Sequence, residues 1–407
     1  MGLKEFKIYL DNPYATYFPN QTVTGKVIVT IDAPKKIRGI KLTVKGEANT
    51  YWSTDRQELN NEGRYINETD TVTGHEEYFK AQFYLTGSSS GDEIELPVGT
   101  HTYPINCVIP PNLPSSFESD FGRIRYTIKA IIDRPWKFDH ETKMAFTVIS
   151  HYDLNQDSSA SEPVMIENSK TFCCLCCGSP PLTVNVSLPV RGYVPGQIIP
   201  VKVNVENQSG KEVNVVKLKL DKVINYTAST PRPETKIVEV TVAEVSKGPI
   251  GGNETTAYEQ TLEVPPLPPS NLKNCKIIDV AYKLNIEACV SGLFSTNLTF
   301  NTPILIGTIP LSSYQMPYPK VNNYVPTVYP KSDESGGMYP SVPEPSAPPA
   351  ADIGFSGLYP NLAPPSYEES QFAAMTLRDR DESDHVIGAK EHFAPRYPVY
   401  NFNAPLQ

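Results

Sequence analysis

An internal repeat limits the folds open to this chain more than any other feature. A constant offset of 176 residues aligns the stretch 193–220 with the stretch 17–44. Both copies begin with turn-forming residues, and apolar residues then alternate with polar ones, which is typical of half-buried β-strands. The repeat therefore predicts two β-sandwich domains in tandem. The matching pairs are Tyr17 and Tyr193, Pro19 and Pro195, Gln21 and Gln197, Lys26 and Lys202, Val27 and Val203, Val29 and Val205, Lys41 and Lys217, and Leu42 and Leu218.

A second similarity appears near the end of each copy, where prolines precede a strong strand. Pro114 closes a proline-rich loop before the strand expected at 124–132, and Pro268 and its neighbours precede the strand expected at 278–289. Tyr282 stands in the second strand as Tyr126 does in the first. With no long stripe of helical period, we expect an all-β chain. Its predicted parts are an N-terminal sandwich at 1–150, a Cys-rich linker at 151–178, a C-terminal sandwich at 179–308 and a tail at 309–407.

The tail differs from the rest of the chain in composition. Residues 309–407 hold 16 of the 39 prolines and nine tyrosines, with few β-branched clusters. Such a segment buries too little apolar surface to offset the loss of chain entropy. We therefore expect a disordered, Pro-rich C-terminal tail with local polyproline II structure.

Net charge and hydropathy indicate the cellular compartment and exclude one class of partner. The net charge is −9, and no long basic block occurs, so nucleic acid is excluded as the main partner. The N-terminus alternates like a strand rather than a signal peptide, and no run of 18 apolar residues is present. These features predict a cytoplasmic protein whose contact with membranes is peripheral.

Four cysteines lie close together in the linker, and they differ from the spaced set of a secreted disulfide scaffold. Four thiolates within five residues cannot readily surround one tetrahedral zinc ion, so no metal is predicted. Two interpretations remain open. The cysteines are sites of S-palmitoylation beside a membrane, or they belong to a strand that happens to be rich in cysteine. They are Cys173, Cys174, Cys176 and Cys177.

Several of these stretches together resemble the α-arrestins, the arrestin domain-containing proteins. They are DNPYATYFPNQTVTGKV, the block from GTHTYPINC to AIIDRPW, FCCLCC with RGYVPGQIIPVKVNVEN after it, and a Pro-rich tail with a PPxY motif. The resemblance covers nearly the whole chain. It implies two arrestin-type, immunoglobulin-like sandwiches in a curved bilobed body. The charged polar core and amphipathic helix of the visual and β-arrestins cannot be located, so no phosphate sensor is assigned to the run 378–382.

The tail contains one complete PPxY motif, formed by Pro364, Pro365, Ser366 and Tyr367. In a polyproline II segment the prolines fit an aromatic-lined groove, and the tyrosine fills the neighbouring pocket of a WW domain. The alternative is a chance match in a tail rich in Pro and Tyr. The resemblance implies that the partners are WW-domain HECT-type ubiquitin ligases.

Two further tail segments are candidate motifs. Pro395 and Tyr397 lie where the resemblance implies a second, weaker WW-binding motif, and plain low-complexity sequence is an equal alternative. Pro345, Ser346, Ala347 and Pro348 form PSAP, which resembles the late-domain motif read by ESCRT-I. Chance occurrence in a tail of this composition is the alternative for PSAP.

No catalytic pattern is present, so we expect neither an enzyme nor a cofactor. The six histidines have no metal-ligand spacing, and no phosphate loop or nucleophile elbow is found. A basic group on one turn and strand could contact acidic cargo or anionic lipid, although a solvated strand face explains it better. The group comprises Lys35, Lys36, Arg38, Lys41 and Lys45.

The leading hypothesis is an intracellular adaptor at the plasma membrane and endosomes. Its body recognises a membrane receptor or transporter as cargo, and its tail recruits the ligase. A flexible tether raises the local ligase concentration to roughly the millimolar range, so weak WW contacts are sufficient. The alternative is a coat-like scaffold similar to the arrestin-like subunit of retromer, in which the tail has no role in recruitment.

Overall fold

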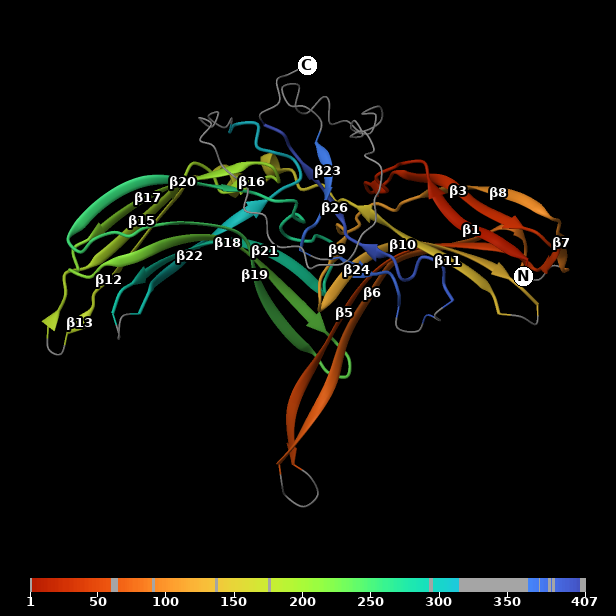
Figure 1. Ribbon diagram of the computed structural model, residues 1–407, viewed down its shortest axis with the longest axis horizontal. Coiled ribbons are helices and arrows are strands. Elements are labelled where there is room, and N and C mark those ends of the chain that lie inside the picture. Colours follow the sequence, from red (N-terminus) through yellow and green to blue (C-terminus); the bar gives the residue numbers. More distant parts are fainter. Residues whose placement is uncertain are drawn as a thin grey trace.

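The computed structural model describes residues 2–59, 65–89, 92–135, 138–174, 177–292, 296–314, 365–372, 374–379, 382 and 385–402. The side chains of residues 58, 59, 66, 173, 174 and 177 are not among the described features. Figure 1 shows two β-sandwiches side by side in a shallow arch, with a long hairpin projecting from the middle. The predicted all-β fold with two tandem β-sandwiches is confirmed.

The N-terminal sandwich consists of two sheets facing each other, and all their strand pairs are antiparallel except β2–β11, which is parallel. One sheet has the order β1-β3-β8, and the other has the order β2-β11-β10-β5-β6 with β9 beside β10. A short pair, β4-β7, lies at the far end of the domain. The strands are β1 (Leu3–Leu10), β2 (Thr16–Tyr17), β3 (Thr22–Ile31), β4 (Lys35–Ile37), β5 (Gly39–Leu59), β6 (Tyr65–Gly87), β7 (Ile94–Leu96), β8 (Gly99–Val108), β9 (Phe117–Glu118), β10 (Gly122–Asp133) and β11 (His140–Val148).

The C-terminal sandwich repeats this plan. Its sheets have the orders β12-β15-β17-β20 and β16-β22-β21-β18-β19. Two short 3-10 helices, η1 (Leu154–Gln156) and η2 (Ser158–Ser161), lead into it. Its strands are β12 (Val164–Lys170), β13 (Cys173–Cys174), β14 (Cys177–Gly178), β15 (Leu182–Leu188), β16 (Gly192–Tyr193), β17 (Ile198–Asn207), β18 (Val213–Ala228), β19 (Glu234–Lys247), β20 (Glu254–Glu263), β21 (Ile278–Val290) and β22 (Leu298–Ile306).

Matching residues of the repeat make matching hydrogen bonds. The side-chain oxygen of Gln21 accepts from the amide of Phe18 at 2.9 Å, and that of Gln197 accepts from Val194 at 3.1 Å. Each bond closes the turn that precedes one of the two equivalent strands, β3 in the first domain and β17 in the second. Near the end of each copy, the hydroxyl of a buried tyrosine donates to a carbonyl of the preceding proline loop. These bonds run from Tyr126 to Pro114 at 2.6 Å and from Tyr282 to Pro268 at 2.7 Å, so the predicted equivalence of the tyrosines is confirmed.

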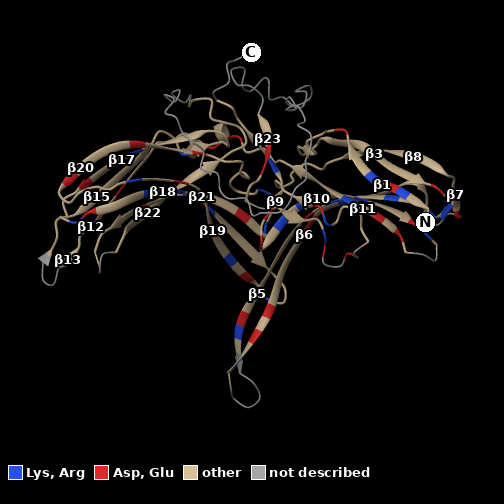
Figure 2. Cartoon of the chain, viewed as in Figure 1, with Lys and Arg blue, Asp and Glu red and all other residues tan. Residues whose placement is uncertain are grey.

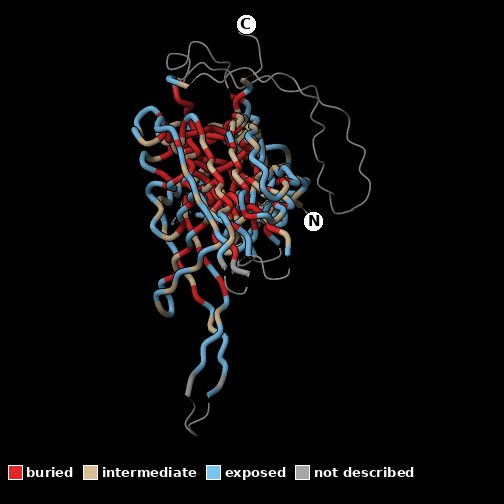
Figure 3. The backbone as a smooth tube through the Cα atoms, turned by 90° about the vertical axis from the view of Figure 1, so that its left-hand side faces the viewer, coloured by how far each residue is buried: buried red, intermediate tan, exposed pale blue. Residues whose placement is uncertain are grey.

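The core follows the alternation that the sequence displays. Val27 and Val29 of β3 and Val203 and Val205 of β17 are buried, while the residues between them face outward. Figure 3 shows burial concentrated in the body and exposure along the projecting hairpin. Burying such side chains contributes about 1.5–3 kcal/mol each.

In the polar stretch 51–74, residues 51–59 and 65–74 form the outer half of the β5–β6 strand pair, and its base is less exposed than its composition suggests. Trp52 is only 3% exposed, and its indole Nε1 donates to Glu234 of the C-terminal domain at 3.2 Å. Asp70 forms an ion pair with Arg232 of that domain. The hairpin therefore joins the two domains before it extends into solvent.

Two predicted segments contain strands that pair within the structure. Residues 164–170, assigned to the linker, form the edge strand β12 of the C-terminal domain, because they pair with β15. In the tail, the described residues of 365–402 lie against the body. They contain β23 (Ser366–Glu369), β24 (Met375–Thr376), β25 (His392–Phe393) and β26 (Arg396–Val399), paired as β23-β26 and β24-β25. We call the described residues of 365–402 the docked tail.

Candidate functional site: the docked tail

Three residues of the PPxY motif are described at the start of the docked tail, and two of them belong to a strand. Ser366 and Tyr367 lie in β23, which pairs antiparallel with β26 so that Tyr367 is opposite Pro398. Pro365 is buried, and the Tyr367 ring lies 6.2 Å from the ring of Tyr14 between centroids. Burial raises the pKa of Tyr367 to about 12. Pro364 lies outside the described residues.

Two tyrosines after the motif anchor β26 to both domains. Tyr397 is buried, and its hydroxyl donates to the carbonyl of Ser116 in the N-terminal domain at 2.9 Å. The hydroxyl of Tyr400 donates to the carbonyl of Thr308 in the C-terminal domain at 2.7 Å. The Tyr400 amide donates to the carbonyl of Pro195 at 3.0 Å. Residues 396–400 of the docked tail thus lie across the boundary between the domains, as Figure 1 shows for β23 and β26.

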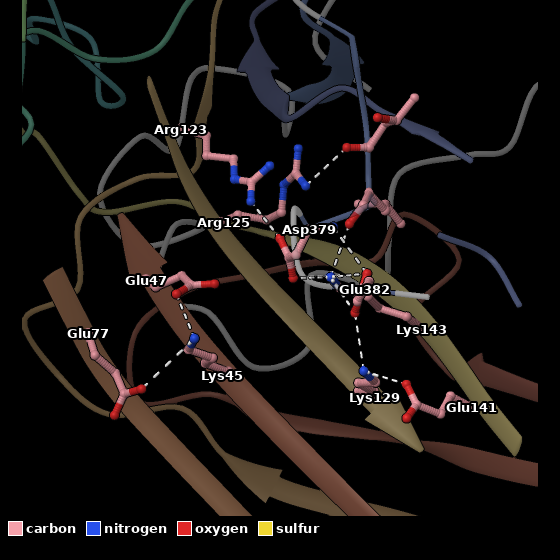
Figure 4. A network of polar contacts seen from close by, with 12 residues as sticks. Lys45, Glu47, Glu77, Arg123, Arg125, Lys129, Glu141, Lys143, Asp379 and Glu382 are labelled. Atoms are coloured by element: carbon pink, nitrogen blue, oxygen red, sulfur yellow. Dashed lines mark hydrogen bonds and ion pairs between the residues drawn. The ribbon is translucent and has the colours of Figure 1, made fainter. Parts of the chain in front are cut away.

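Acidic residues of the tail contact basic side chains of β10 and β11 in the N-terminal domain (Figure 4). Asp379 contacts Arg123 and Lys143, each at 2.5 Å. Glu382 contacts the ammonium groups of Lys143 and Lys129, each at 3.2 Å. Burial alone would raise the pKa of Asp379, but the charges of Lys143 and Arg123 outweigh it and hold this pKa below its usual value. We call these five residues the tail ion network.

A buried ion pair lies directly behind this network. The guanidinium of Arg125 in β10 contacts the carboxylate of Glu118 in β9 through two bonds, at 2.6 and 2.8 Å. The two side chains are 2% and 0% exposed. Arg125 also donates to the carbonyl of Thr376 in the tail at 3.1 Å, which connects the buried pair to the docked segment.

Apolar residues complete the contact between tail and body. Leu377, Val386 and Ala389 are buried in the docked tail. Phe372 lies 5.3 Å from the ammonium of Lys222, measured to the ring centroid. Lys222 is itself buried, and burial lowers its pKa to about 8.

The predicted basic group on β4 and β5 lies partly beside this site. Lys41 and Lys45 line an open cavity on the N-terminal domain, together with Arg123, Lys129 and Lys143. Lys45 is paired with Glu47 at 2.6 Å. Figure 2 shows both signs of charge interleaved along the β5–β6 hairpin.

The other predicted site residues lie elsewhere. The small β13–β14 strand pair at the outer end of the C-terminal domain contains Cys173, Cys174 and Cys177. Cys174 lies opposite Cys177 in its antiparallel register. Cys176 and the PSAP residues 345–348 lie outside the described residues. Pro395 and Tyr397, the second tail motif, belong to the anchored end of the docked tail.

Sequence reasoning missed the tail ion network, although one signal for it was present. No proline occurs between Pro365 and Pro395, which interrupts an otherwise Pro-rich tail. This gap contains Leu377, Val386 and Ala389, which the body buries, and also Asp379 and Glu382. Composition averaged over the whole tail conceals this change.

Within the described ranges, no helix is long and apolar enough to span a membrane. No group of three or more His, Cys, Asp or Glu in the same ranges is placed to hold a metal ion.

Comparison with known proteins agrees with the fold. The family model described as arrestin (or S-antigen), N-terminal domain, matches residues 6–155, and the corresponding C-terminal domain model matches 179–311. Arrestin domain-containing protein 17 of Caenorhabditis elegans is 32% identical, over 98% of this chain and 99% of that protein. Arrestin domain-containing protein 1 of Mus musculus is 27% identical, over 88% of this chain and 74% of that protein. Arrestin domain-containing protein 4 of Mus musculus is 28% identical, over 75% of this chain and 72% of that protein. This chain therefore belongs to the arrestin family, as a member of its α-arrestin, or arrestin domain-containing, group.

Proposed function

We propose that this protein is an intracellular adaptor that links membrane-protein cargo to WW-domain HECT-type ubiquitin ligases. In this proposal it promotes ubiquitination, endocytosis and endosomal sorting of the cargo, and it is not an enzyme. The observation that carries the proposal is a complete PPSY motif on a tail behind two arrestin domains. The body selects cargo, and the tail brings the ligase to it.

The motif is tested by replacing Pro365 and Tyr367 with alanine in the full chain. We expect co-purification of WW-domain ligases to be lost, because a WW groove needs both the proline ridge and the tyrosine ring. A matched control replaces Tyr359 and Pro360, which removes the same residue types outside the motif. The control should recover the ligases as the native chain does. If the PPSY variant also recovers them at the native level, the proposed mechanism is wrong.

The PSAP segment extends the proposal to ESCRT-I. Its extended proline ridge and small Ala347 suit a narrow groove of the type that reads late-domain motifs. Replacing Pro345 and Pro348 with alanine should abolish recovery of ESCRT-I from cells while WW-domain ligases are still recovered. Equal ESCRT-I recovery from both chains would show that PSAP has no role in recruitment.

We also propose that the cysteine cluster is S-acylated and that this modification attaches the body to a membrane. The supporting observation is that Cys173, Cys174 and Cys177 lie in the β13–β14 strand pair at the outer end of the C-terminal domain, away from the docked tail. Changing Cys173, Cys174, Cys176 and Cys177 to serine should abolish thioester-linked lipid measured by hydroxylamine-dependent acyl exchange. Cys275→Ser is the control, since burial raises the pKa of that thiol and weakens its nucleophilicity. Full labelling of the four-serine variant would contradict the proposal.

A further inference from the structure

The PPSY motif occupies a position that a WW domain could not share. A WW groove contacts the prolines and the tyrosine ring of a polyproline II segment. Here Pro365 is buried, and the Tyr367 ring packs beside Tyr14 at 6.2 Å. Pro365 and part of the Tyr367 ring, two surfaces that a WW domain contacts, therefore face the body.

The backbone of the motif is also engaged. Ser366 and Tyr367 are paired with Val399 and Pro398 in the β23–β26 ladder. The Ser366 hydroxyl donates to the Val399 carbonyl at 3.3 Å. A segment in such a strand pair cannot at the same time adopt the solvated polyproline II conformation, which has no internal ladder.

The strand β26, in turn, is firmly attached to the body. Tyr397 and Tyr400 bind it to the two domains through their hydroxyl groups. The Arg396 amide donates to the Thr147 hydroxyl at 3.1 Å, and the Arg396 guanidinium pairs with Glu369 of β23 at 2.7 Å. Exposure of the motif thus requires β23 to separate from a strand that is anchored at several points.

We infer that the docked tail withholds the PPSY motif, so that WW-domain binding and tail docking exclude each other. This inference rests on the proposed function and adds its regulation. The body then acts as an intramolecular competitor of the ligase. Any event that releases the tail then increases ligase recruitment.

The expected effect follows from population arithmetic. If only a fraction of molecules has a released tail, the apparent Kd for a WW domain equals the intrinsic Kd divided by that fraction. With the tail docked in about nine molecules of ten or more, the full chain binds at least about tenfold more weakly than a free peptide of residues 358–372.

The first test compares three full chains and this peptide in binding to a purified PPxY-binding WW domain. Asp379→Lys places a cation beside Arg123 and Lys143 without touching PPSY, and it should bring the affinity to within about twofold of the peptide. Glu391→Lys is the matched control, because it makes the same change at an exposed tail position whose carboxylate has no ion pair among the described contacts. The control should bind as weakly as the native chain.

The second test closes the strand pair covalently. Glu369 and Arg396 are directly opposite each other in the ladder, so a Glu369→Cys/Arg396→Cys chain can be joined by a disulfide. The oxidised form should lose WW binding, and reduction should restore it. A peptide carrying Glu369→Cys controls for the effect of the substitution on the motif itself.

The outcomes separate the two proposals. A peptide that does not bind the WW domain defeats the proposed function. A peptide that binds, with the native and oxidised full chains binding equally well, leaves the proposed function intact and overturns the inference that docking withholds the motif.

Discussion

Replacing Arg125 with methionine should lower the free energy of unfolding of the N-terminal domain by about 3–5 kcal/mol. Arg125 and Glu118 are almost fully buried and joined by two charged hydrogen bonds. Methionine fills much of the volume but leaves the Glu118 carboxylate without a counterion, and an uncompensated buried charge is costly. Chemical denaturation followed by circular dichroism measures the change.

A second substitution shows whether the loss comes from charge or from packing. Arg125→Met combined with Glu118→Leu removes both charges and should regain most of the stability, because apolar residues can replace a buried pair at little cost. Lys26→Met, on the exposed face of β3, is the control and should change stability by less than about 0.5 kcal/mol. A double variant as unstable as the single one would show that the stabilisation does not lie in charge pairing.

Replacing Lys143 with methionine should release the docked tail. Lys143 is 3% exposed and contacts both Asp379 and Glu382, so its loss leaves two carboxylates facing Arg123 and Lys129 alone. We expect docking to weaken by about 2–3 kcal/mol, less than for a fully buried pair because Asp379 is 35% exposed. Hydrogen exchange at the Tyr400 amide, which bonds to Pro195, should accelerate roughly 30- to 150-fold.

Neutralising the tail acids tests the same network from the other side. Asp379→Asn with Glu382→Gln in the Lys143→Met chain should return part of the lost protection, because the unpaired carboxylates are gone.

The pH dependence of tail docking has a defined sign. The pKa of Asp379 is lowered in the docked state, so its contribution to docking is complete above the pKa of the free carboxyl. That contribution is lost as the pH falls through the lower, docked value. Protection of the Tyr400 amide that stays unchanged in Lys143→Met would contradict the role given to the network.

The sequence predicted the motif in the tail but not the position of the tail on the body. The PPSY residues were recognisable because the motif is local, four residues long and chemically specific. Their place in β23 could not be predicted from the sequence. The strand β23 pairs with β26 about thirty residues later, and neither strand has an extended alternating pattern. Tyr397, predicted as part of a weaker motif, lies in the core because the body provides a carbonyl for its hydroxyl at Ser116.

The sequence by itself determined the two sandwiches. Alternation of period two specifies which face of each strand is buried, and the repeated Gln21 and Gln197 turns set the same start in both domains. Only the tertiary structure decided that the tail docks. Asp379 meets Arg123 across 256 positions of the chain, and charge pairing at that separation has no local pattern. This pairing depends on the outer face of β10 and β11. Strand alternation marks that face as polar, but the docked tail covers it.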